Sequence, residues 1–170
     1  MRHVAARSSN RLEAAHSKTV FWYNLRHMTT DLFIERAAAA AAQVHAVPDG
    51  AAAEREVEAI RAEKGAVGLA VGVARAAKGI AQTGTCIVVA DDEKLRLETM
   101  LPEVSVILLN RADILPDLPS AAPFLRAEQT QGRASYVSFI TGPSRTADIE
   151  RVSAIGVHGP LELHIVLIGG

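Results

Sequence analysis

A short stretch near the carboxyl end of the sequence, T-G-P-S-R-T, combines residue types that bind anions. Gly142 would let a ligand approach the backbone, and the Ser144 and Thr146 hydroxyls could cap a helix turn while leaving amide N–H groups free. Arg145 would add a planar, permanently charged fork for a carboxylate or a phosphate. A second interpretation stays open, because the acidic residues that follow could satisfy the helix N-terminus themselves and leave a capped turn with an exposed arginine.

Two other stretches combine glycine with side chains that could contact a ligand. Thr83, Gly84 and Thr85 place two hydroxyls beside a glycine, a pattern that suits either a ligand contact or a hairpin turn. His158 lies in G-V-H-G-P, where an imidazole could act as general acid or base. A turn with an incidental surface histidine explains the same residues. The catalytic residue is therefore left unassigned, with His158 as the first candidate.

Other kinds of site have no signature in the sequence. No set of His, Asp and Glu has metal-ligand spacing, and neither a nucleophile elbow nor a glycine-rich nucleotide loop occurs. Cys86, the one cysteine, lies in an apolar run and is expected to be a buried structural thiol. A lone cysteine cannot hold an iron–sulfur cluster. The sequence therefore predicts no metal site and no cofactor in this chain.

The elements that must position these residues are expected to form one domain. A chain of 170 residues, 49% apolar and 4% aromatic, suits a single core built from Ala, Val, Leu and Ile. Residues 28–170 are expected to be this domain. Residues 1–27 lack an apolar period and are interpreted as a disordered arm or a misplaced start.

Hydrophobic periodicity predicts helices and strands that alternate along this domain. Helices are expected over residues 30–43, 51–64 and 91–100, a short helical turn over 147–151, and strands over 44–47, 85–90, 104–109, 135–140 and 163–168. Gly65 is predicted to be the C-cap of the second helix. Because the strands are continuous apolar runs, we expect an α/β fold with a mainly parallel open sheet covered by helices. Ligands in such sheets sit at the carboxyl ends of strands, where T-G-P-S-R-T is predicted to lie.

The charge distribution argues against nucleic acid as a partner. Residues 1–27 carry five of the 18 Lys and Arg but only one of the 19 Asp and Glu, so the predicted domain is acidic and lacks a basic stripe. No apolar run approaches the roughly 20 residues that a membrane-spanning helix needs. The free thiol suits a reducing compartment, so we expect a cytoplasmic protein.

Several motifs resemble those of a known family. They read S-F-I-T-G-P-S-R-T-A-D-I-E (138–150), G-V-H-G-P (156–160), L-H-I-V-L (163–167), G-I-A-Q-T-G-T (79–85) and Q-V-H-A-V (43–47). Together they are similar to the lactate utilisation protein C, or LUD-domain, family over about residues 30–168. Gln82 departs from the pattern, because the family typically has Glu there and a glutamine cannot ionise.

This resemblance implies a fold like that of sugar-phosphate isomerases, CoA transferases and 5-formyltetrahydrofolate cyclo-ligase (NagB/RpiA/CoA transferase-like). It also implies a role in oxidising L-lactate to pyruvate beside iron–sulfur subunits, which would carry the clusters that this chain cannot hold. We therefore expect a non-redox subunit or accessory protein that binds a small anion. Its expected ligand-binding residues are Thr83, Gly84, Thr85, Gly142, Ser144, Arg145 and Thr146.

Two other hypotheses stay open. The chain could be a free-standing enzyme that acts on a CoA ester, a folate or a sugar phosphate, an idea that rests on fold analogy alone. That activity would need a nucleophile or a base, for which His158 is again the first candidate. Alternatively, the chain could be a structural interaction module in which the glycines only pack loops. Binding of a small anion would separate the last hypothesis from the others.

Overall fold

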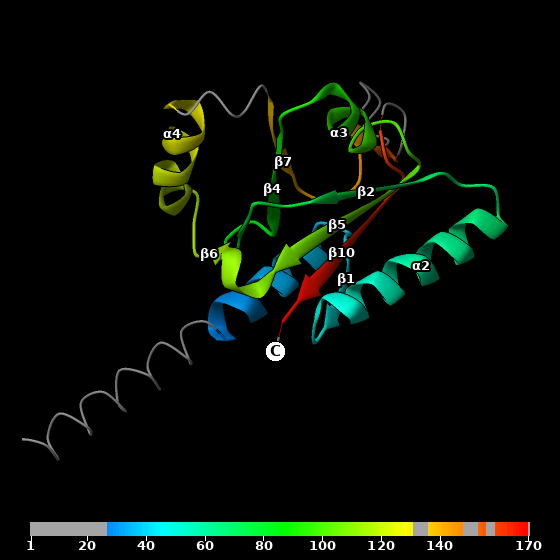
Figure 1. Ribbon diagram of the computed structural model, residues 1–170, viewed down its shortest axis with the longest axis horizontal. Coiled ribbons are helices and arrows are strands. Elements are labelled where there is room, and N and C mark those ends of the chain that lie inside the picture. Colours follow the sequence, from blue (N-terminus) through cyan, green and yellow to red (C-terminus); the bar gives the residue numbers. More distant parts are fainter. Residues whose placement is uncertain (1–26, 131–135, 148–152, 156–158, 170) are drawn as a thin grey trace, which may run out of the picture.

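The structure is a computed structural model that describes residues 27–130, 136–147, 153–155 and 159–169 (Figure 1). It begins with a helix over residues 27–39, called the first helix below. The elements that follow are β1 (Gln43–Val47), α2 (Gly50–Ala66), β2 (Val71–Arg75), β3 (Lys78–Ile80), β4 (Thr85–Ala90), α3 (Glu93–Glu98), β5 (Val104–Asn110), β6 (Ile114–Leu115), α4 (Ala122–Thr130), β7 (Tyr136–Ile140), β8 (Arg145–Ala147), β9 (Ser153–Ile155) and β10 (Glu162–Ile168).

Four strands form a fully parallel sheet in the order β1-β10-β5-β2. Alternate residues of β5 face opposite sides, so Val104 and Val106 belong to one apolar cluster, and Ile107 and Leu109 to another. Both faces of the strand are thus buried, which is why its sequence is apolar at every position except Ser105 and Asn110. The predicted parallel sheet flanked by helices is confirmed.

A second sheet has the order β6-β3-β4-β7, with antiparallel pairs β3–β4 and β4–β7 and a parallel pair β3–β6. The sequence did not predict this division of the strands into two sheets. The hairpin interpretation of residues 83–85 is confirmed, because Gly84 lies in the turn between β3 and β4 and has a positive φ of 66°.

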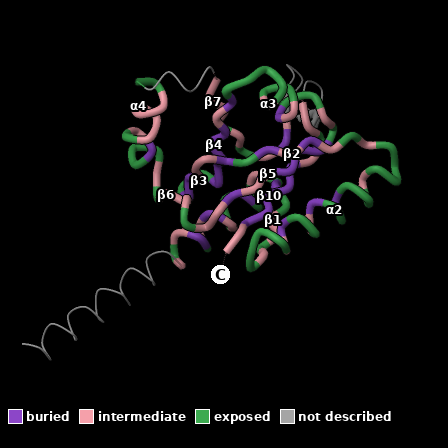
Figure 2. Tube along the Cα trace, viewed as in Figure 1, coloured by how far each residue is buried: buried purple, intermediate pink, exposed green. Residues whose placement is uncertain are grey.

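The layers are seen in Figures 1 and 2, where the buried residues concentrate along the strands. Helix α2 covers one face of the parallel sheet through Ala53, Val57 and Ile60. The first helix and the second sheet share a core with the other face, and Phe33 and Cys86 lie in it. Helix α4 packs on the far side of the second sheet. Both faces of the parallel sheet are therefore buried, one by α2 and the other by the first helix together with the second sheet.

Helix α2 ends later than the sequence suggested. Its C-cap is Val67, not Gly65, which lies inside the helix. Gly68, with a positive φ of 83°, follows as the left-handed residue. Its N–H donates to the Gly65 carbonyl, while the Leu69 N–H donates to the Lys64 carbonyl. The predicted C-cap is therefore wrong by two positions, because Gly68, one residue after the true C-cap, supplies the left-handed conformation that this type of helix end requires.

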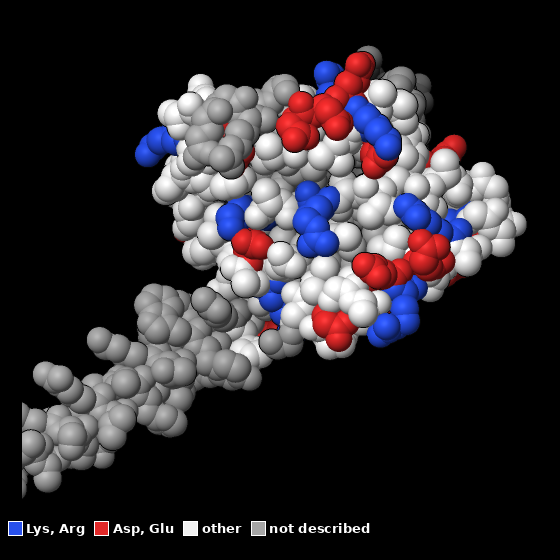
Figure 3. Space-filling view, in the orientation of Figure 1, with Lys and Arg blue, Asp and Glu red and all other residues white. Residues whose placement is uncertain are grey.

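The surface carries both signs of charge. On the face seen in Figure 3, acidic and basic side chains are interspersed and do not gather into a stripe of one sign. Within the described ranges, no helix has the length and hydrophobicity to cross a membrane.

Candidate functional site

A cavity of about 290 Å³ lies at the carboxyl end of β7, where the T-G-P-S-R-T stretch begins. Residues 141–144 form one wall, the end of α3 contributes Thr99 and Met100, and the starts of β5 and β10 contribute Ser105 and Leu163. The cavity therefore lies at the amino ends of two parallel strands. Ligands of parallel α/β sheets usually bind at the carboxyl ends of the strands. Here the cavity lies at the carboxyl end of β7, which belongs to the second sheet, and not at the carboxyl ends of the parallel strands.

Ser105 places a hydroxyl in the cavity wall. The residue is 2% exposed and stands opposite Leu163 in the pairing of β5 with β10. No hydrogen bond joins its hydroxyl to another described residue, and the hydroxyl oxygen is not sealed from solvent. A hydroxyl that is open to a cavity can bond a water molecule or a ligand there. Ser105 therefore offers the cavity one hydrogen-bonding group.

Three threonine hydroxyls form a chain that reaches the same wall. The Thr85 Oγ1 lies 2.6 Å from the Thr83 Oγ1 and 2.7 Å from the Thr141 Oγ1. Thr85 is 4% exposed, whereas Thr141 lines the cavity. Thr83 and Thr85 thus do not line the cavity themselves, but they fix the hydroxyl of the residue that does.

The two predicted glycines pack against the first helix. Gly84 and Gly142 have positive φ values of 66° and 71°. A Cβ on Gly84 would overlap the backbone of Ala37, and one on Gly142 would overlap the carbonyl oxygen of Ala40. Close helix packing therefore explains why both positions are glycine, and Gly142 lines the cavity as well.

The chain beyond Pro143 enters a strand and not a helix. The Ser144 N–H donates to the Pro160 carbonyl at 2.9 Å, so this amide is already used. Arg145 and Thr146 belong to β8, which pairs antiparallel with β9. The helical turn predicted from residue 147 is wrong at Ala147, which ends β8, and its other residues lie outside the described ranges. An anion site made from a helix N-terminus therefore does not form at Ser144.

Electrostatics at the cavity come from dipoles and not from full charges. This holds for the described lining residues, which include no Lys, Arg, His, Asp or Glu. The hydroxyls of Thr99, Ser105, Thr141 and Ser144 are its polar side-chain groups, and the Thr99 hydroxyl already donates to the Arg96 carbonyl. The Thr141 hydroxyl is bonded to that of Thr85, so Ser105 and Ser144 carry the two hydroxyls of the lining that have no partner among the described residues.

Of the other residues singled out in the sequence, one lies outside the described residues and one is buried in the core. The first catalytic candidate, His158, lies outside the described residues. Cys86 is fully buried, and burial raises the pKa of its thiol to about 12, so it stays protonated and unreactive, as expected of a structural thiol. Within the described part of the chain, no three His, Cys, Asp or Glu side chains gather so as to hold a metal ion.

The sequence interpretation missed Ser105, Thr99 and Thr141. A signal for Ser105 was present, because it is the one polar residue in the apolar run from Val104 to Leu109. A serine in a strand that is covered on both faces is a polar group in an apolar core, where it needs a hydrogen-bond partner. Such a residue is a reason to look for a cavity beside the strand.

A larger, shallower hollow of about 450 Å³ beside α3 contains none of the predicted residues.

Comparison with known proteins gives relatives that share this part of the chain. The chain is 35% identical to an uncharacterized protein of Escherichia coli, YkgG, over 100 residues, which are 58% of this chain and 43% of that protein. It is 30% identical to lactate utilization protein C of Geobacillus thermodenitrificans over 100 residues, 58% of this chain and 42% of the relative. The chain thus spans less than half the length of these relatives.

A solved structure has the same fold. The crystal structure of a DUF162 family protein from Deinococcus radiodurans superposes with a TM-score of 0.60 at 16% identity, over 85% of this chain and 98% of that chain. The family model of the LUD domain matches residues 69–168, a range that contains every residue lining the cavity. The chain therefore belongs to the LUD domain family.

Proposed function

We propose that this chain is a non-redox component of lactate utilisation that binds a small carboxylate in the cavity beside β7. The observation that carries the binding role is the hydroxyl of Ser105, which lies in the cavity wall without a partner among the described residues. The link to lactate comes from relatives such as lactate utilization protein C of Geobacillus thermodenitrificans.

The ligand is proposed to be a small 2-hydroxy or 2-oxo acid such as L-lactate or pyruvate. A cavity of about 290 Å³ suits a small molecule. Hydroxyls of Ser105, Thr141 and Ser144 would donate to the carboxylate, and hydrogen bonds to an ionised acceptor are stronger than neutral ones. Ile140 and Leu163 in the same wall supply apolar contact for a methyl group.

Arg145 is proposed as the cation for the carboxylate. Its position follows directly on Ser144, the last residue of the T-G-P-S segment that lines the cavity. A guanidinium holds a carboxylate in a bidentate pair that fixes orientation as well as charge. The described lining residues supply no other cation, so the proposed affinity depends strongly on this side chain.

The electrons of lactate oxidation are proposed to pass to partner subunits. Oxidising a 2-hydroxy acid to a 2-oxo acid removes two electrons, and Cys86 is a buried, protonated thiol. Iron–sulfur clusters need several cysteine ligands, whereas this chain has one cysteine. A partner that carries clusters would complete the reaction.

Purification of the tagged chain from its native host tests this partnership. We expect cysteine-rich proteins to co-elute and to give the broad visible absorption of iron–sulfur clusters, with mass spectrometry identifying them. A purification with the tag alone is the control. A colourless protein that elutes without partners would contradict the proposal, and turnover of a CoA ester, a folate or a sugar phosphate by that protein would favour a free-standing enzyme.

A further inference from the structure

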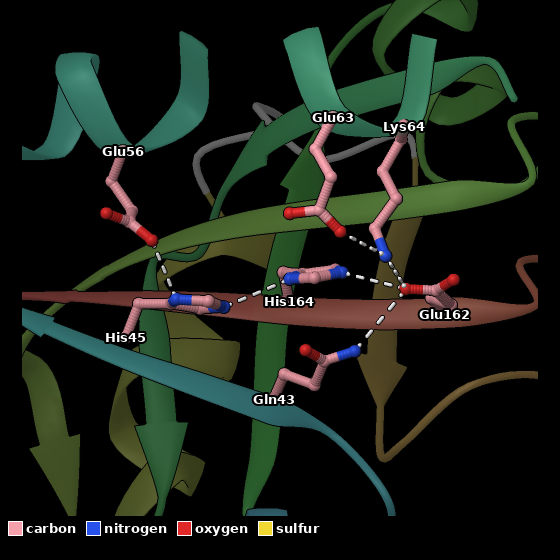
Figure 4. A network of polar contacts seen from close by, with 7 residues as sticks. All are labelled: Gln43, His45, Glu56, Glu63, Lys64, Glu162 and His164. Carbon is pink, nitrogen blue, oxygen red and sulfur yellow. Dashed lines mark hydrogen bonds and ion pairs between the residues drawn. The ribbon is translucent and has the colours of Figure 1, made fainter. Parts of the chain in front are cut away.

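A network of polar contacts joins α2 to the adjacent strands β1 and β10, on the sheet face opposite the cavity (Figure 4). His45 on β1 contacts both α2 and β10. Its Nδ1 is 2.7 Å from the Glu56 Oε1 on α2, and its Nε2 is 3.0 Å from the His164 Nδ1 on β10. The His164 Nε2 lies 3.1 Å from the Glu162 Oε2.

The same network holds α2 at a second point. Lys64 near the end of α2 donates to the Glu162 Oε2 at 2.8 Å and to the Glu63 Oε1 at 3.1 Å. The Gln43 Nε2 donates to the Glu162 Oε2 at 3.3 Å. Glu162 therefore accepts from three elements at once. His164 is 2% exposed and has a partner on each ring nitrogen.

The number of protons that the histidine pair can hold is set by its contacts. There are three of them: Glu56 to His45, His45 to His164, and His164 to Glu162. Each contact needs one hydrogen between its two heavy atoms. Two neutral imidazoles supply two hydrogens. One extra proton on the pair completes all three contacts. A second extra proton would place N–H groups of two imidazolium rings against each other across 3.0 Å, where neither can accept.

The surroundings oppose a charge on His164. Burial lowers the pKa of His164 from its ordinary value of 6.5, and the positive charges of His45 and Lys64 lower it further, against the opposing effect of Glu162. The folded chain therefore resists protonation of this ring. The bond from Lys64 lowers the pKa of Glu162, so Glu162 stays an acceptor and does not take up the proton.

We propose that the His45–His164 pair is a pH-sensitive latch that docks α2 on the parallel sheet while it holds at most one extra proton and loosens α2 when both rings are protonated. The charged groups that face the pair are Glu56, Glu63 and Lys64 from α2 and Glu162 from β10. Loosening would uncover the apolar strip formed by Val104, Val106 and Val166 under α2. The surface released by acid would thus be hydrophobic.

The direction of the pH dependence follows from linkage. An unfolded chain protonates both histidines as the pH falls through about 6.5, whereas the folded chain resists protonation of His164. The stabilising contribution of the pair is therefore present above pH 6.5 and is lost as the pH falls below it. The pKa of Glu162 is lowered from its ordinary value of 4.5 by the bond from Lys64, so the histidine response precedes loss of the Lys64–Glu162 ion pair as the pH falls.

Hydrogen exchange of the full chain between pH 7.5 and 5 tests this latch. After correction for intrinsic exchange rates, we expect amides of α2 to lose about tenfold in protection relative to those of α4. His164→Gln keeps a polar side chain but cannot gain a proton, so the pH response of α2 should vanish. Glu58→Gln on the same helix, where Glu58 pairs with Arg61 on the surface, is the matched control and should respond like the wild type.

A second measurement keeps the proposal testable if His164→Gln does not fold. Titration of the wild-type histidine ring nitrogens by NMR should show one ring that gains its proton only below pH 6.5, together with shifts of α2 amides at the same midpoint. Protection of α2 that stays constant across the pH range would overturn the proposal. So would an equal loss of protection in α2 and α4.

Discussion

Replacing Gly84 with alanine is expected to lower the free energy of unfolding by about 2–5 kcal/mol. The left-handed conformation, with φ of 66°, costs a non-glycine residue about 1–2 kcal/mol. The new Cβ would also overlap the backbone of Ala37 in the first helix, and forcing such an overlap costs about 1–3 kcal/mol more. Urea denaturation followed by circular dichroism measures the change.

Gly65→Ala is the matched control for this substitution. Gly65 lies inside α2, has no positive φ, and a Cβ there would meet nothing within 4 Å. We expect this variant to gain about 0.5–1 kcal/mol, because alanine favours the helix. A Gly84→Ala variant as stable as the wild type would show that the turn between β3 and β4 does not press against the first helix.

Truncating Phe33 to alanine is expected to cost about 3–5 kcal/mol. Phe33 is the largest fully buried side chain of the first helix, and its ring lies 3.2 Å from where a Cβ on Gly79 would stand. Its loss opens a hole in the core that joins the first helix to both sheets. The midpoint of urea unfolding should fall accordingly, while Met28→Ala, at a residue 68% exposed, should change stability by less than about 0.5 kcal/mol.

Unchanged stability of the Phe33 variant would mean that the first helix is not part of the folding unit. The two predictions are connected, because the first helix contacts both glycine loops, at Ala37 and at Ala40. A chain in which this helix is undocked should therefore also lose the cavity wall at Gly142.

Much of the parallel sheet could be predicted because its strands are buried on both faces. Val104–Asn110 and Glu162–Ile168 are mainly apolar on both faces, and a covered parallel sheet buries such strands on both sides. The hairpin around Gly84 was predictable from local turn chemistry. The second sheet was not, because β3 and β6 are only three and two residues long and gain their pairing from tertiary contacts.

The cavity could be predicted only in part. Gly142 and Ser144 were identified from residue type, and both line it. The predicted helix after Pro143 was wrong at Ala147, because pairing of β8 with β9 outweighed the capping pattern of the hydroxyl residues. The Ser105 hydroxyl escaped notice because it comes from a strand 36 positions before Thr141, and only the fold brings the two walls together. The pairing of His45 with His164 could not be predicted for the same reason, because the two residues are 119 positions apart in the sequence.

Calorimetric titration of the full chain with L-lactate and with pyruvate tests the carboxylate-binding proposal most directly. We expect saturable binding by the wild type, with affinity reduced about tenfold in Ser105→Ala because one hydrogen bond to a charged group is lost. Arg145→Ala should weaken binding further with little change in melting temperature. Ser120→Ala, which removes a hydroxyl bonded to Asp117 away from the cavity, should bind like the wild type. Absence of saturable binding by the wild type, or equal affinity of the Ser105 variant, would contradict the proposed site.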